Sequence, residues 1–191
     1  MKFEMTTRLL GVFSLIGCLQ ACNGSDGGVK DPGNRDSGPV VVAPTANLVI
    51  NELQPSNQDT VTDEKGDADD WLEIYNAGTS TVDLKGFVVS DSKGTAQTIS
   101  STLTIEAGAY LLLWADASPG QGAAHLGFKL SAGNGGTVTI SDQHGNALDT
   151  VTFGAATGQN TYARFPNGSG SFSWCDKPTP LASNGSACGV P

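Results

Sequence analysis

Long apolar runs, histidine and basic residues are all scarce in this sequence, and each scarcity removes a class of protein. No stretch reaches the roughly 18 consecutive apolar residues of a membrane-spanning helix. Only two histidines occur, His125 and His144, and there is neither a Gly-x-Ser-x-Gly elbow nor a His-x-x-x-His spacing. We therefore predict no enzyme and no catalytic residue, although a triad of residues distant in sequence would escape such a search.

Basic residues are outnumbered, with 10 Lys and Arg against 19 Asp and Glu and a formal net charge of -9. Such a surface repels phosphate backbones and anionic headgroups, so nucleic acid is not an expected partner. A sustained 3.6-residue apolar period is also missing, which disfavours helices. The 25 glycines, together with many serines and threonines, favour turn-rich β structure instead.

The N-terminus has the features of an export signal. Lys2 and Arg8 precede the short apolar run 9–17, and a small residue precedes each of the cysteines at 18 and 22. The four residues ending at Cys22, Leu-Gln-Ala-Cys, resemble the lipobox of bacterial lipoproteins, and the four ending at Cys18 resemble it too. We favour Cys22 because a polar, glycine-rich stretch follows it at once. The alternative is that the cysteines merely sit in an ordinary cleaved signal.

A lipid on Cys22 would make a membrane the first partner of the chain. Two or three acyl chains anchor a protein stably, since each buried CH₂ contributes about 0.8 kcal/mol. We expect a signal peptide over 1–21, a flexible tether over 22–45 that is too polar to fold, and one domain over 46–191. The expected location is extracytoplasmic, at the outer membrane or cell surface of a bacterium.

Besides the lipidated Cys22, the mature chain would keep two cysteines, Cys175 and Cys188. An even pair in an oxidising compartment predicts a disulfide, which would close the proline-rich tail between them. A metal site or two free thiols are the alternatives.

From residue 47 onward, short apolar or alternating runs are separated by turn residues, the pattern of an all-β sandwich or barrel. Glu52 shares the alternation of Leu48 and Ile50, so we expect it either at a strand end or paired on that face, with Arg164 as its partner. The expected strands are 48–53, 71–76, 82–84, 87–89, 109–115, 126–130, 137–140, 148–153, 162–165 and 172–174.

An ordered set of short motifs resembles bacterial lamin-tail domains. The set begins with Leu-Val-Ile-Asn-Glu-Leu at 48–53 and Asp-Trp-Leu-Glu-Ile-Tyr-Asn at 70–76, and ends with Arg-Phe-Pro-Asn-Gly at 164–168 and the segment 178–184. The resemblance implies an immunoglobulin-like β-sandwich that acts as an interaction module. Leu181 departs from it, because a small residue such as glycine is expected there.

Acidic residues crowd the stretch between the first two expected strands. Calcium binds six to eight oxygens, and Asp-rich loops with glycine supply them, although the spacing here is not that of an EF-hand. The alternative is a solvated acidic turn. The candidate metal ligands are Asp63, Asp67, Asp69, Asp70 and Glu73.

Three functions are consistent with these features. The first is a non-catalytic, membrane-tethered surface or periplasmic module that binds an unidentified protein or glycan. The second is a calcium-stabilised adhesion or carbohydrate-binding domain that uses the acidic loop. Trp71, Trp114 and Trp174 could line a sugar platform, but tryptophans of a sandwich more often lie in the core. The third is a small secreted hydrolase.

Overall fold

The computed structural model describes residues 47–188, so the expected signal peptide and tether lie outside the described residues. Within 47–188 the chain forms β strands and two short 3-10 helices, η1 (Pro119–Gln121) and η2 (Gly185–Cys188). No helix in this part of the chain is long and apolar enough to cross a membrane. The strands are β1 (Leu48–Gln54), β2 (Trp71–Asn76), β3 (Val82–Asp83), β4 (Val88–Asp91), β5 (Ala96–Thr98), β6 (Thr104–Ile105), β7 (Tyr110–Trp114), β8 (Gly136–Ser141), β9 (Ala147–Phe153), β10 (Thr161–Phe165) and β11 (Ser171–Cys175).

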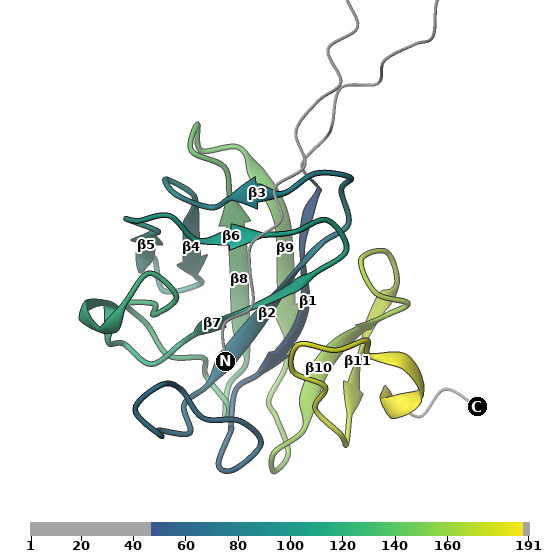
Figure 1. Ribbon diagram of the computed structural model, residues 1–191. Helices are drawn as coiled ribbons and strands as arrows, with labels where there is room; N and C mark the ends of the chain where they lie inside the picture. The colour runs from purple at the N-terminus through teal and green to yellow at the C-terminus, as the bar shows by residue number, and fades with distance from the viewer. Residues whose placement is uncertain (1–46, 189–191) are drawn as a thin grey trace, which may run out of the picture. The chain divides into compact units, whose positions relative to one another are not determined.

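The strands form two main antiparallel sheets and a small two-stranded one. The larger sheet has the order β11-β10-β1-β2-β7, the second has the order β5-β4-β8-β9, and β3 pairs with β6 (Figure 1). Strand β1 therefore lies in the middle of its sheet, between its sequence neighbour β2 and the distant β10. The predicted immunoglobulin-like β-sandwich is confirmed.

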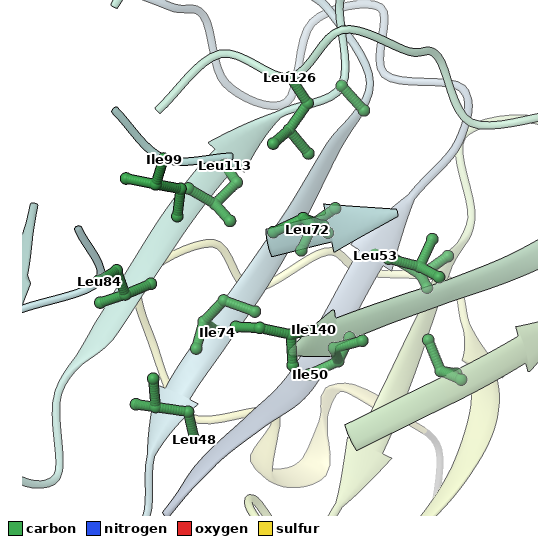
Figure 2. Close-up of a cluster of buried hydrophobic side chains, with 14 of the residues drawn as sticks. Leu48, Ile50, Leu53, Leu72, Ile74, Leu84, Ile99, Leu113, Leu126 and Ile140 are labelled. Carbon is green, nitrogen blue, oxygen red and sulfur yellow. The ribbon is translucent and has the colours of Figure 1, made fainter. Parts of the chain in front are cut away.

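The core fills the space between the two main sheets. Figure 2 shows Ile50 of β1 and Ile74 of β2 reaching toward Ile140 of β8, and all three are fully buried. Burial of one such side chain contributes about 1.5–3 kcal/mol, so the apolar contacts between the two sheets stabilise the fold strongly.

A bulge in β1 explains why Glu52 shares the alternation of core residues without lying in the core. Ile50 is opposite Ile74 and Glu52 is opposite Glu73, so Asn51 is an extra residue between them. One extra residue exchanges the two faces of a strand. Glu52 consequently faces the outside of the sandwich, and Leu53 takes the core position.

One expected strand, 126–130, does not form. Leu126, Phe128 and Leu130 are buried as an alternating strand requires, but the segment makes only isolated bridges, at His125 and Lys129. The alternation therefore indicates burial but not a strand, because no neighbouring strand offers a ladder of hydrogen bonds.

The C-terminal tail turns back beside β10 and β11 and ends in η2 (Figure 1). The predicted disulfide between Cys175 and Cys188 is present and joins the end of β11 to the end of the tail. It therefore holds the segment 176–188 against the larger sheet.

Removing this disulfide should weaken the domain without unfolding it. In the chain-entropy model, a loop of this size contributes about 3 kcal/mol, so Cys188→Ser should lower the Tm by roughly 10 °C. Thermal unfolding followed by circular dichroism measures the shift. A reductant should lower the Tm of the parent to that of the variant and leave the variant unchanged; equal Tm values for oxidised parent and variant would contradict the prediction.

Candidate functional site

The acidic loop between β1 and β2 is held in a defined shape by amide side chains. Asn57 donates to the carbonyls of Val61 (2.7 Å) and Asp69 (2.9 Å), which joins the two arms of the loop. Gln54 accepts from the indole of Trp71 at 2.8 Å and donates to Thr60 at 3.1 Å. The position of the loop is thus fixed by buried or half-buried hydrogen bonds.

A small apolar cluster lies beneath the loop, on the outer face of the larger sheet. Trp71, Leu112 and Trp114 form it, and Val61 of the loop and Ala124 pack against it. Since Ala124 precedes His125, the loop and the segment that carries the histidine both pack against this cluster. Both tryptophans are buried, so they are not available as a sugar platform.

Asp63 is the centre of the loop. Its backbone closes a turn with Asp67 and Gly66, and Gly66 has a φ of 89°, which glycine adopts without strain. The Oδ1 atom of Asp63 accepts from the amides of Lys65 (2.8 Å) and Asp67 (2.9 Å). These hydrogen bonds, led by that of Asp67, hold the pKa of Asp63 below its ordinary value, so the buried carboxylate is charged.

Three of the five predicted metal ligands meet here. Carboxylate oxygens of Asp63, Asp67 and Asp69 lie within 4.8 Å of one another. Asp69 is also 3.3 Å from the ammonium of Lys129, a countercharge that the sequence did not place near the loop. Oxygen ligands of this kind suit calcium, and binding remains a prediction.

The other two predicted ligands lie outside this group. Asp70 follows it directly, and burial raises the pKa of its carboxyl to about 6, against the opposing charge of Lys129. Glu73 is on β2, where its side chain is hydrogen-bonded to Asn51 and to the amide of Leu181.

His125, which the sequence does not link to the acidic loop, contacts it through Glu64. Its Nδ1 is 2.7 Å from Asp116 Oδ2, and its Nε2 is 3.0 Å from Glu64 Oε1. Burial lowers the pKa of His125, but the hydrogen bonds to Asp116 and Glu64 outweigh it and the pKa is raised. No local motif could have revealed this triad, because its members are up to 61 positions apart and meet only through the fold.

A second set of buried carboxylates lies under the C-terminal tail. Glu52 and Glu73 are opposite each other on β1 and β2, and both are fully buried. Glu52 accepts from the amide and the hydroxyl of Thr179, at 2.9 and 2.8 Å. Glu73 accepts from Asn51 at 3.0 Å and from the amide of Leu181 at 2.6 Å. The tail therefore supplies donors that these two carboxyl groups need.

Burial raises the pKa of both glutamates. The amide of Thr179 opposes the rise at Glu52, while at Glu73 the pKa reaches about 8, with the neighbouring Glu52 adding to the rise.

Leu181, where a small residue was expected, has a φ of 60° and is exposed. A left-handed backbone favours glycine, which gives a physical reason for that expectation.

Arg164 does not pair with Glu52, so that expectation was wrong. The bulge turns Glu52 to the outer face, while Arg164 donates to Asp149 at 2.9 Å and to the carbonyl of Ile50 at 3.1 Å. Arg164 also stacks over Phe172 with a distance of 4.5 Å to the ring centre. The arginine thus joins the two main sheets at β9 and β10.

The topology and the paired sheets define an immunoglobulin-like β-sandwich with an acidic loop at one end. The family model for the Lamin Tail Domain matches residues 42–155, more than half of the chain. The chain belongs to the lamin tail domain family. No curated protein matches it significantly. The family indicates an immunoglobulin-like interaction module, a fold that is typically non-catalytic.

The buried glutamates predict a stability that falls as pH rises. In the unfolded chain Glu73 titrates near 4.5, whereas the folded chain keeps its proton up to about pH 8. Between these values the folded state binds more protons, so raising the pH costs free energy, on the order of a few kcal/mol. The Tm should fall from pH 5 to pH 9, and less steeply in Glu73→Gln.

The control for this measurement is Glu106→Gln, which changes an exposed glutamate in the turn before β7. Its pH slope should equal that of the parent protein. The dependence of Tm on pH that remains in Glu73→Gln arises from Glu52, Asp70 and His125, whose pKa values are also raised. Identical slopes for Glu73→Gln and the parent would refute the assignment.

Proposed function

We propose that this protein is a non-catalytic interaction module, held at an extracytoplasmic membrane surface by a lipid on Cys22. The observation that carries the proposal is the lipobox-like motif ending at Cys22, directly before a polar tether and a lamin tail domain. The domain binds a protein or glycan, and the tether over 22–45 gives it reach from the membrane.

Two further features support a binding role rather than chemistry. Both ring nitrogens of His125 are already in contact with carboxylates, so no hydroxyl nucleophile contacts this histidine in the described chain. The surface is acidic as well, which favours partners with basic or neutral surfaces over nucleic acid.

Replacement of the lipidated cysteine tests the anchoring. Cys22→Ala should abolish labelling with a fatty-acid analogue and move the protein from the membrane fraction to the soluble fraction. Cys18→Ala serves as the matched control and should keep both label and location. Unchanged labelling of Cys22→Ala would overturn the assignment and point to Cys18.

A second candidate function is a calcium-stabilised adhesion or carbohydrate-binding domain. The meeting of Asp63, Asp67 and Asp69 favours it, because three carboxylates repel one another unless a cation neutralises them. Calcium would bind the folded loop and stabilise it by mass action.

Calcium should therefore raise the Tm, and Asp67→Asn combined with Asp69→Asn should remove the rise. Magnesium at equal ionic strength is the control, since a loop that is only screened by salt responds equally to both ions. Calorimetric titration without saturable calcium binding would leave the loop as a solvated acidic turn.

A further inference from the structure

Asp63 carries an oxygen that nothing in the described chain satisfies. The side chain is only 8% exposed, and while Oδ1 accepts two amides, Oδ2 is buried without a hydrogen-bond partner. A buried carboxylate oxygen without a partner costs free energy, so native proteins rarely leave one. A cation beside Oδ2 would remove this cost.

Two other groups that can bind metal ions lie beside the carboxylate of Asp63. Ligand atoms of Asp63, Glu64 and His125 all lie within 4.8 Å of one another. In a tetrahedral zinc site, bonds of 2.0–2.2 Å place neighbouring ligand atoms about 3.4 Å apart. His125 Nε2 is already 3.0 and 3.2 Å from the two carboxylate oxygens of Glu64, close to that spacing.

The far side of the histidine ring has the arrangement that metal-binding histidines show. Asp116 Oδ2 is 2.7 Å from Nδ1, and both residues are buried, which fixes the ring so that Nε2 points to Glu64. A carboxylate on the second nitrogen is the usual outer partner of a zinc-bound imidazole, where it orients the ring and makes it a better ligand.

We propose that Asp63, Glu64 and His125 bind one divalent ion of the zinc class, with Asp116 as the positioning residue behind the histidine. Imidazole nitrogen favours zinc and the later transition metals, whereas calcium takes oxygen ligands alone. The site shares Asp63 with the calcium candidate but adds a histidine from a different segment, and so it is a different site with a different ion.

The competing arrangement is an ion pair without metal, in which His125 is protonated and pairs with Glu64. That pair accounts for Glu64 and for Asp116, but it leaves Asp63 Oδ2 unpaired. Glu64 is 57% exposed, so water could solvate it without the histidine. The charge of His125 helps to lower the pKa of Asp63, but it gives Oδ2 no hydrogen bond, whereas an ion between the three groups could bind a carboxylate oxygen of Asp63 directly.

Calorimetric titration of zinc into the full chain tests the proposal. The chain should carry Cys18→Ser and Cys22→Ser, so that no free thiol competes for the ion. One zinc ion should bind per molecule. Glu64→Gln changes a largely exposed side chain and keeps its size, and it should weaken zinc binding about tenfold or more. His125→Gln should abolish the binding.

The chain contains its own controls. His144 lies exposed in the turn between β8 and β9, so His144→Gln should bind zinc like the parent, and so should Glu106→Gln. Nuclear magnetic resonance should show zinc shifting the ring nitrogens of His125 and leaving those of His144 unchanged. This spectrum decides the question even where His125→Gln fails to fold. Asp116→Asn should lower zinc affinity about 10- to 100-fold and leave the calcium response intact.

Three results would overturn the site: no saturable zinc binding, equal affinity in the parent and in Glu64→Gln, or loss of binding in His144→Gln. The double variant Asp67→Asn with Asp69→Asn separates the two cation hypotheses, because it should remove calcium stabilisation while zinc affinity stays within about twofold. Failure of one hypothesis therefore does not decide the other.

Discussion

Two glutamates that face each other across neighbouring strands, Glu52 and Glu73, decide how the C-terminal part of this domain folds. Both are removed from water on the outer face of the larger sheet, where an unpaired carboxyl group would be costly. The donors that satisfy them come from Asn51 in the bulge and from Thr179 and Leu181 in the tail. The tail is therefore an integral part of the sandwich rather than an appendage.

The same polar patch reaches into the neighbouring strands and turns. The side chain of Asn184 donates to the backbone carbonyls of Asn51 (3.1 Å) and Arg164 (2.7 Å). Its backbone amide donates to the side chain of Asn167 at 3.1 Å. Asn167 in turn donates to the hydroxyl of Tyr110 at 2.6 Å. Residues of β1, β2, β7, the segment 164–167 and the tail thus converge on one patch, and the disulfide keeps the tail in place. Such a network is stable only when every member has its partner.

Much of the fold could be predicted from the sequence, because alternation of apolar residues reports burial directly. The strand 71–76, for example, is predicted with its observed bounds. Alternation does not report pairing, so it predicts a strand over 126–130 where the structure has only isolated bridges. It also fails at a bulge, and the bulge at Asn51 accounts for the wrong partner given to Glu52.

The candidate site was predicted only in part, for a related reason. Asp63, Asp67 and Asp69 are close in sequence, so their meeting could be anticipated from the loop alone. Asp116, His125 and Lys129 all follow β7 in the sequence, more than 45 positions after the loop. His125 contacts Glu64 and Lys129 contacts Asp69, while Asp116 contacts His125; the tryptophan cluster beneath packs against both segments. Contacts of this kind follow from tertiary packing and leave no local signal.

The central place of β1 has a consequence for the order in which the molecule can assemble. A ribosome or an export channel releases the N-terminal end of a chain first. Strand β1 then emerges with only β2 available as a neighbour, while its other edge waits for β10, more than 100 residues later. The carboxyl groups of Glu52 and Glu73 receive their hydrogen-bond donors later still, when residues 179–181 have emerged. The sandwich can close only after nearly the whole chain has been released, so until then the nascent domain keeps an open strand edge, the kind of surface on which chaperones act.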